Sequence, residues 1–245
     1  MFSLEKICFA YPNEDPVIKN FSLEIADGER ICILGANGCG KSTLLKILAA
    51  LIFPQSGSFR AFGELINQKK FNEKFSKHYH RRIGFVFPDS DVQLFCSTVF
   101  EELAFGPLQL GLTHEEINNK IDKLAETLDI KKLLHKTPFH LSDGEKKKTA
   151  IAGVLIMDPD VLIMDEPTNA LDPRSQSWLL RVIEALHKAG KTLIMATHNL
   201  EFAGKTADRA VLFDEDHRLA FDGPAREILG DREQLRRVNL ISEDD

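Results

Sequence analysis

Gly35-Ala36-Asn37-Gly38-Cys39-Gly40-Lys41-Ser42-Thr43 decides the fold, because it fits the phosphate-binding pattern G-x-x-x-x-G-K-[ST] at every fixed position. It follows an apolar run at residues 30–34, typical of a buried strand, and leads into an amphipathic helix expected over residues 42–51. The glycines let successive backbone N–H groups point into one concavity, and the helix adds the positive end of its dipole. We therefore predict a nucleotide phosphate site, with Lys41 on the β- and γ-phosphates and the Ser42 hydroxyl on Mg²⁺.

Two carboxylates follow a second apolar run. Residues 161–164 predict a buried parallel strand that ends at Asp165 and Glu166. Asp165 is placed to help hold Mg²⁺, and Glu166 to polarise a water for attack on the γ-phosphate. A further strand expected at residues 192–197 ends at His198, which could contact the γ-phosphate from another side. Each polar residue alone would more often be a solvated or capping residue, but together around one phosphate loop they predict nucleotide hydrolysis.

The composition is that of an ordinary globular chain of 245 residues, with 43% hydrophobic residues, 28% charged residues and a net charge of −6. This acidic balance argues against a nucleic-acid partner, and the basic runs at residues 81–82 and 146–148 are interpreted as solvated faces. No apolar run approaches the roughly 18 residues that span a bilayer, and the first residues lack the pattern of a secretory signal. We expect a protein of the cytosol or of the cytosolic face of a membrane.

The four cysteines are interpreted as reduced thiols, because no two of them are spaced as a C-x-x-C pair. They are Cys8, Cys32, Cys39 and Cys96. Cys39 lies inside the phosphate loop beside a helix N-terminus, a position that lowers the pKa of a thiol. Two interpretations of Cys39 stay open: a small residue that the loop tolerates, or a reactive thiol.

A helical lobe is predicted within the α/β core. Residues 88–157 carry no strong strand signal, and two capping boxes, at residues 113–116 and 142–145, predict helices that end near residues 128 and 157. The stretch between the strand expected at residues 83–87 and the strand at residues 161–164 is therefore expected to be an insertion.

Turn signals divide the remainder of the chain. A helix over about residues 174–189 is closed by Gly190, and residues 67–82 are expected to form a surface loop or a frayed helix. Residues 231–245 are interpreted as a helical fragment with an acidic tail. The other strands are expected at residues 2–9, 17–25 and 58–62, and a hairpin at residues 210–213 and 218–222.

Over nearly its whole length the sequence resembles the ATP-binding subunits of ABC transporters. Tyr11 stands where that family has an aromatic residue stacked on adenine, residues 35–43 match the Walker A loop, and residues 161–166 match Walker B with its catalytic glutamate. Residues 141–145 (LSDGE) match the signature motif, usually LSGGQ, which separates this family from other phosphate-loop proteins. The D-loop at residues 169–172 and the switch histidine His198 complete the series.

The resemblance implies an α/β fold, with a P-loop NTPase core of ABC ATPase type, an N-terminal antiparallel β subdomain and an inserted α-helical subdomain. Residues 1–245 would form a single ABC ATPase domain. The core with its β subdomain would occupy residues 1–87 and 158–230, the helical subdomain residues 88–157, and a C-terminal tail residues 231–245.

The resemblance also assigns residues and cofactors, which are ATP and Mg²⁺. The catalytic residues would be Glu166 and His198, and the metal ligands Ser42 and Asp165. The ATP-binding residues would be Tyr11, Gly35, Ala36, Asn37, Gly38, Cys39, Gly40, Lys41, Ser42 and Thr43.

Subunits of this family work as head-to-tail dimers, so the resemblance implies a homodimer or a heterodimer with a paralogous ATPase. Each ATP would lie between the Walker motifs of one subunit and the signature residues of the other, which are Ser142, Asp143, Gly144 and Glu145. The N-terminus of the signature helix would offer N–H groups and a dipole to the γ-phosphate. The resemblance further implies an integral-membrane transporter subunit as partner, no nucleic acid, and a peripheral position on the cytoplasmic face of the cell membrane.

Within the family, residues 93–107 look like the energy-coupling-factor branch, which drives uptake of vitamins or of cobalt and nickel ions. A signature of the SDGEKK type resembles its cobalt/nickel members. Phe95, Phe100 and Phe105 are candidates to line a groove for a helix of the membrane partner, although core packing of the helical lobe explains each of them equally well.

Three residues depart from the family pattern. Pro88 stands where the Q-loop glutamine is expected, and Gln93 comes five residues too late. Asp143 replaces a glycine, and Glu145 replaces a glutamine but is a capping-box partner for Ser142. Two alternatives to an importer ATPase therefore stay open: a soluble ABC-family ATPase without a transporter, and a degenerate nucleotide-binding regulatory subunit.

Overall fold

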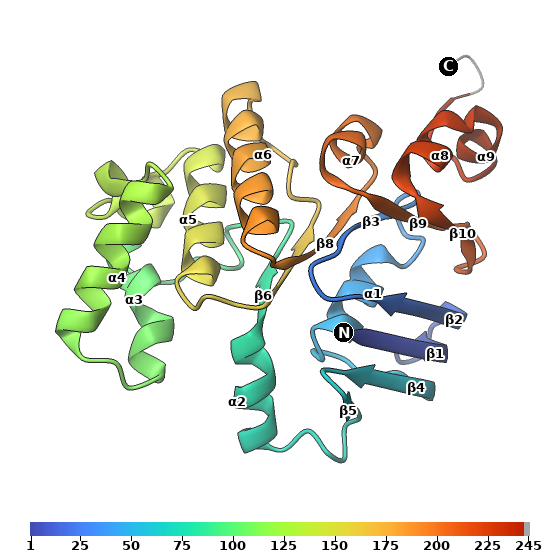
Figure 1. The fold of residues 1–245 in the computed structure, drawn as a ribbon, viewed down its shortest axis with the longest axis horizontal. Coiled ribbons are helices and arrows are strands. Elements are labelled where there is room, and N and C mark those ends of the chain that lie inside the picture. The colour runs from blue at the N-terminus through green and yellow to red at the C-terminus, as the bar shows by residue number, and fades with distance from the viewer. Residues whose placement is uncertain (243–245) are drawn as a thin grey trace.

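A four-stranded antiparallel sheet carries the N-terminal part of the chain (Figure 1). The computed structural model describes residues 1–242, so the acidic residues predicted at the very end of the tail lie outside the described part. The strand order is β2-β1-β4-β5. Their bounds are β1 (Phe2–Ala10), β2 (Pro16–Ile25), β4 (Ser56–Ala61) and β5 (Glu64–Leu65).

A second sheet of six strands has the order β10-β9-β3-β8-β7-β6, and all neighbours are parallel except the edge strand β10. The strands β3, β7 and β8 are almost entirely buried, as apolar strands of a parallel sheet covered on both faces should be. The bounds are β3 (Arg30–Leu34), β6 (Ile83–Val86), β7 (Val161–Asp165), β8 (Thr192–Thr197), β9 (Arg209–Phe213) and β10 (Leu219–Pro224).

Two hydrophobic cores lie on the two faces of this sheet. Successive residues of a strand point to opposite faces, so Ile31 and Ile33 of β3 join the core shared with the first sheet and α1 (Lys41–Leu48). Cys32 and Leu34 join the core on the helical side. Two sheets with a phosphate-loop helix between them confirm the predicted fold class.

Three helices between β6 and β7 form the helical lobe, on the left of Figure 1. They are α3 (Val99–Gln109), α4 (His114–Thr127) and α5 (Asp143–Leu155), with short 3₁₀ turns η1 (Lys131–Leu133) and η2 (Pro138–His140). The capping boxes predicted at Thr113 and Ser142 are both formed. A third box, at Thr98 with Glu101, starts α3, a helix whose bounds the sequence had not indicated.

The remaining helices connect the strands of the second sheet. The helix α6 (Pro173–Lys188) agrees with the expected one, and Gly190 after it has a φ of 77°. Residues 73–82 were expected to belong to a loop or frayed helix, but they form a regular helix, α2 (Glu73–Arg82). Asn72 caps this helix. Tyr79 anchors it, because its ring is buried and its hydroxyl donates to the Leu48 carbonyl. The short helices are α7 (Leu200–Thr206), α8 (Ala225–Gly230) and α9 (Arg232–Arg237). Within residues 1–242, no helix is long and apolar enough to cross a membrane.

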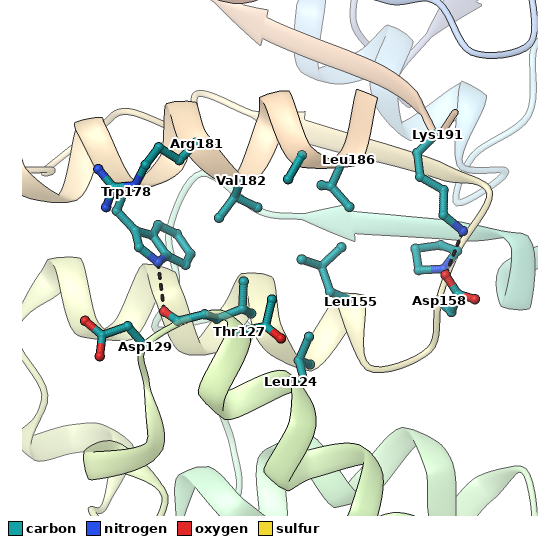
Figure 2. Close-up of a pocket in the computed structure, with 13 residues that line it drawn as sticks. Leu124, Thr127, Asp129, Leu155, Asp158, Trp178, Arg181, Val182, Leu186 and Lys191 are labelled. Atoms are coloured by element: carbon teal, nitrogen blue, oxygen red, sulfur yellow. Dashed lines mark hydrogen bonds and ion pairs between the residues drawn. The ribbon is translucent and has the colours of Figure 1, made fainter. Parts of the chain in front are cut away.

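A cavity of about 610 Å³ lies where α4, α5 and α6 meet (Figure 2). Its floor is apolar, and the indole N–H of Trp178 donates to the Leu128 carbonyl at 2.8 Å, which fastens α6 to the end of α4. Lys191 and Asp158 form an ion pair at the other end. None of the lining residues belongs to the phosphate loop or to the carboxylates after β7, so this cavity lies outside the predicted site.

Candidate functional site

The phosphate loop joins β3 to α1 through glycines in left-handed conformations. Gly40 caps α1 with a φ of 114°, and a Cβ at this position would lie 2.5 Å from the Val17 carbonyl oxygen. Gly35 has a φ of 154°, and a Cβ there would lie 2.5 Å from the sulfur of Cys39. Only glycine combines this backbone conformation with such close neighbours, so the glycine spacing is a requirement of the loop.

Lys41 is held inside the loop that it follows. Its side chain is buried, and its ammonium donates to the carbonyls of Gly35 at 2.8 Å and Ala36 at 3.1 Å. The same nitrogen lies 3.8 Å from Oε1 of Glu166. The arrangement holds one fixed positive charge at the concavity of the loop, where a phosphate group would need it.

Asp165 ends β7 beside this loop and is only 2% exposed. Burial raises the pKa of its carboxyl, while a hydrogen bond from Ser42 opposes that rise. Within residues 1–242, Oδ1 of Asp165 has no hydrogen-bond partner. A buried carboxylate oxygen without a partner is costly unless a cation or water completes it, so Asp165 and the Ser42 hydroxyl fit a hard divalent cation that takes its other ligands from phosphate and water.

Glu166 and His198 meet at the ends of β7 and β8. Oε1 of Glu166 lies 2.9 Å from Nδ1 of His198, and Oε2 accepts a hydrogen bond from the Thr197 hydroxyl at 3.0 Å. The backbone of Glu166 has a φ of 43°, in the left-handed region, and its N–H donates to the Ala196 carbonyl. A non-glycine residue disfavours this backbone conformation, so the surrounding structure must hold Glu166 in it, as is common at functional sites. The sequence did not predict this role for Thr197, because it indicates only that Thr197 is the last residue of a strand.

Tyr11, the aromatic residue expected to stack on adenine, lies next to the start of α1. Its hydroxyl is 3.3 Å from that of Thr43, and its ring packs edge-on against Phe9. One face of a half-buried ring beside the phosphate loop is compatible with stacking on a base.

The interpretation of Cys39 as a reactive thiol is wrong. Its side chain is 4% exposed and belongs to the core between the two sheets. Burial raises the pKa of the thiol, and the opposing effects of Lys41 and of nearby backbone N–H groups do not outweigh it. The sequence pattern places the backbone of Cys39 in the phosphate loop but does not reveal that its side chain points away from the concavity.

The signature residues lie at the N-terminus of α5, in the helical lobe, and α1 lies outside this lobe (Figure 1). Oε2 of Glu145 accepts hydrogen bonds from the N–H and the hydroxyl of Ser142, and Oε1 lies 3.1 Å from the Lys136 ammonium. These contacts, the backbone N–H of Ser142 above all, lower the pKa of Glu145. The Glu145 side chain, which replaces the usual glutamine, thus holds Ser142 in its capping conformation, as predicted. In the described residues, no hydrogen bond or ion pair joins residues 142–145 to residues 35–43.

Gly144 of the signature packs against the start of α6. A Cβ at Gly144 would lie 2.5 Å from the Ser175 hydroxyl, which donates to the Asp172 carboxylate at 3.0 Å. Asp172 also caps α6 by accepting from the Ser175 N–H. The signature helix and the D-loop are therefore in contact through a position that has no room for a side chain, a relationship that neither motif reveals alone.

Gln93 is turned into the protein and does not point toward the carboxylates. Its Oε1 accepts from the Phe87 N–H at 3.0 Å, and its amide nitrogen lies 3.4 Å from the carbonyls of Phe85 and Ala150. Its side chain is used to hold the end of β6, so it does not replace the glutamine expected at position 88.

Similar proteins are known over nearly the whole length of this chain. Residues 18–169 match the family model described as ABC transporter. A protein of Caldanaerobacter subterraneus that carries the name ABC transporter ATP-binding protein is 45% identical over 98% of this chain and 99% of its own length. The nickel import ATP-binding protein NikO of Rhodobacter capsulatus is 41% identical over 98% of this chain and 95% of its own. The solved structure of CbiO1 from Clostridium perfringens, part of the ABC transporter complex CbiONQ, superposes with a TM-score of 0.84 at 34% identity, covering 98% of this chain and 94% of that one.

Proposed function

This chain belongs to the ABC transporter family of ATPases, and we propose that it is the ATP-hydrolysing subunit of an energy-coupling-factor importer for nickel or cobalt ions. The observation that carries the proposal is an exposed apolar surface on the helical lobe, described below, in a chain that also brings Lys41, Glu166 and His198 together. A degenerate regulatory subunit would have no need to keep Lys41, Asp165, Glu166 and His198 in one arrangement.

ATP would bind with its phosphates in the loop of residues 35–43 and its adenine against Tyr11. Ser42 and Asp165 would hold Mg²⁺, which supplies charge neutralisation to the phosphates when bound. The unpartnered oxygen of Asp165 supports this assignment. Lys41 would exchange the carbonyls of Gly35 and Ala36 for phosphate oxygens, which are stronger acceptors.

Glu166 would orient and polarise the attacking water. Its carboxylate is already positioned by the Thr197 hydroxyl and by Nδ1 of His198. The imidazole is half-exposed on its other side, which leaves it free to contact the γ-phosphate. Positioning of this kind by several fixed partners is what general base catalysis requires.

A second ATPase subunit would complete the site. The signature residues 142–145 belong to the helical lobe and not to the element that carries the phosphate loop of the same chain (Figure 1), so a second subunit would supply them. The capped N-terminus of α5 would then offer its N–H groups to the γ-phosphate. The second subunit would be another copy of this chain or a paralogue.

The surface for the membrane subunit would be formed by residues 92–110. Val92 and Phe95 are 71% and 64% exposed, and Phe95 lines one hollow with the exposed α3 residues Phe105 and Leu108. The rings of Phe95 and Phe105 meet edge-on at 4.9 Å, at the mouth of a hollow of about 400 Å³ lined also by Phe100. Exposed, clustered apolar side chains favour a helix of a partner as occupant, so the groove interpretation is favoured for Phe95 and Phe105, whereas Phe100 also packs against the core.

The proposed solute rests on the relatives, because an ATPase subunit does not touch what is transported. NikO carries nickel import in its name, and CbiO1 belongs to a CbiONQ complex. A vitamin, which other members of the same branch take up, is the alternative solute. A position on the cytoplasmic face of the membrane follows from the proposed partner.

Co-expression with the membrane-protein genes adjacent to this gene tests the proposal. Cells that express the whole set should accumulate ⁶³Ni²⁺ or ⁵⁷Co²⁺, and the variant Glu166→Gln should abolish uptake. The double variant Phe95→Ser/Phe105→Ser should lose co-purification with the membrane subunit while its own ATPase activity is kept. Leu65→Ser, an exposed apolar residue on β5, is the matched control. Uptake that continues with Glu166→Gln, or a complex that survives the double variant, would refute the proposal.

A further inference from the structure

Lys147 is a buried lysine that points from the signature helix toward the end of β6. It lies in the second turn of α5 and is 3% exposed. Its ammonium donates to the Pro88 carbonyl at 2.7 Å and to the Phe87 carbonyl at 3.1 Å. Within residues 1–242, no carboxylate lies within ion-pair distance of it.

This placement is costly, which indicates that it serves a purpose other than packing. Removing an ammonium from water is unfavourable, and burial lowers the pKa of Lys147, although the charges of Asp89 and Asp165 oppose that effect. An apolar side chain of similar length would fill the same space without this cost. An apolar side chain, however, could not donate hydrogen bonds to the two consecutive carbonyls of Phe87 and Pro88.

The two carbonyls lie at the same edge of the sheet as Asp165 and Glu166. The strands β6 and β7 are parallel with Val86 opposite Met164. Phe87 and Pro88 therefore leave the sheet at the level at which Asp165 and Glu166 follow β7. The long-range charge effect of Asp165 on Lys147 agrees with this proximity.

Two further contacts join the same loop to α5. The amide of Gln93 lies between the carbonyls of Phe85 and Ala150, and the ammonium of Lys146 lies 2.6 Å from Asp91. These contacts are long or exposed, with donor–acceptor distances of 3.4 Å for Gln93 and a half-exposed carboxylate for Asp91. The two bonds from Lys147 are shorter than those of the Gln93 amide and better buried than the Lys146 ion pair, and they reach the residues nearest the strand end.

We propose that Lys147 is a positioning residue for ATP hydrolysis. Its ammonium fixes the backbone at position 88, where the family has a glutamine side chain, to the helix that carries the signature residues. Pro88 has no N–H and offers only its carbonyl, so a side-chain donor from α5 is the available means of holding it.

The test compares Lys147→Met with Lys120→Met in steady-state ATPase assays. Lys120 is a matched control, because it is also a helical lysine of this lobe whose ammonium donates to a backbone carbonyl, that of Ile156 at 3.1 Å. We expect kcat of Lys147→Met to fall about tenfold with the KM for ATP within about twofold, because nucleotide binding in the loop is untouched. Lys120→Met should keep kcat, and Lys147→Arg should recover most of it, since arginine retains the donors and the charge.

Thermal unfolding of each variant separates positioning from folding. The melting temperature of Lys147→Met should match that of Lys120→Met within a few degrees, although only the former loses kcat. If Lys147→Met does not fold, Lys147→Gln, which keeps one donor, takes its place with the same expectation. A wild-type kcat in the Lys147 variant, an equal loss in Lys120→Met, or no recovery with arginine would overturn the proposal.

Discussion

Nδ1 of His198 lies 2.9 Å from Oε1 of Glu166, although 32 residues separate them in the chain. The contact forms because β7 and β8 are neighbouring parallel strands that end at the same edge of the sheet. The ammonium of Lys41 lies 3.8 Å from the same oxygen. One carboxylate thus connects Lys41 of the phosphate loop to His198, so its removal is the sharpest test of the proposed site.

Glu166→Gln should lower ATP turnover at least about a hundredfold, because the amide cannot act as a base. It keeps the size of the side chain, so ATP binding should persist and the ATP-bound dimer should accumulate. Turnover assays and size-exclusion chromatography with ATP and Mg²⁺ measure both effects. Glu201→Gln, an exposed glutamate on α7, is the control and should behave as wild type. A Glu166→Gln protein that turns over ATP, or that stays monomeric with ATP bound, would contradict the assignment.

Lys41→Ala should weaken ATP binding by about 1.5–3 kcal/mol, roughly ten- to a hundredfold, and remove hydrolysis. The reason is the loss of the one cation fixed at the concavity of the loop. Calorimetric titration with ATP measures the change, and Lys77→Ala, an exposed lysine of α2, is the control. Wild-type affinity in Lys41→Ala would place the nucleotide elsewhere.

Local pattern was sufficient to predict the phosphate loop, the acidic strand end and the two capping boxes. Their signals lie within a few adjacent residues, where geometry follows directly from the sequence. The short helices α7 and α8 were missed, because they span only six or seven residues and have little apolar periodicity. The helix α2 was predicted only as a loop or frayed helix for a related reason, because its sequence is polar and only Tyr79 in it is buried.

Contacts between distant segments could not be predicted from these patterns. The hydroxyl of Thr197 on Glu166, the packing of Ser175 against Gly144 and the bonds of Lys147 to Pro88 each depend on which strands and helices are neighbours. The direction of the Cys39 side chain was misjudged for the same reason. The loop pattern fixes the backbone, but the core between the two sheets decides where the sulfur lies.

Gly144→Ala should destabilise the protein by about 1–3 kcal/mol, because the added methyl group would overlap the Ser175 hydroxyl and disturb the cap of α6. Gly153→Ala in the same helix has open space around it and should be neutral or slightly stabilising. Chemical denaturation measures both, and the double variant Gly144→Ala/Ser175→Ala should recover part of the loss. Equal stability of the two glycine variants would show that the signature and the D-loop do not touch.

Cys39 should resist thiol reagents in the native protein, with or without ATP. Its sulfur is buried, and the raised pKa leaves little thiolate at neutral pH. Mass spectrometry of peptides after brief treatment with iodoacetamide should find Cys39 unlabelled until denaturant is added. The half-buried Cys8 is the internal comparison and should label first. Rapid labelling of Cys39 that ATP prevents would restore the reactive-thiol interpretation.

Pro88→Gln should raise basal hydrolysis about tenfold, which corresponds to about 1.4 kcal/mol of barrier. Proline at this position offers no side-chain oxygen to Mg²⁺ or to the attacking water, so Ser42 would be the only direct side-chain ligand, with Asp165 acting through water. Neither neighbour replaces the missing amide. Asp89 accepts a hydrogen bond from the Asp91 N–H, and the side-chain oxygen of Gln93 accepts one from the Phe87 N–H.

Faster hydrolysis in Pro88→Gln could come from the added amide or from a more flexible loop. Pro88→Ala is the control, because it removes the proline ring without adding an amide. Alanine also lacks a side-chain oxygen, and it keeps the carbonyl that Lys147 binds. Steady-state assays over a range of Mg²⁺ concentrations should show faster turnover and a lower Mg²⁺ requirement for Pro88→Gln alone. If Pro88→Ala accelerates hydrolysis as much, rigidity at position 88 limits the rate. If neither variant differs from wild type, the missing glutamine has no cost in this protein, and another group already performs its role.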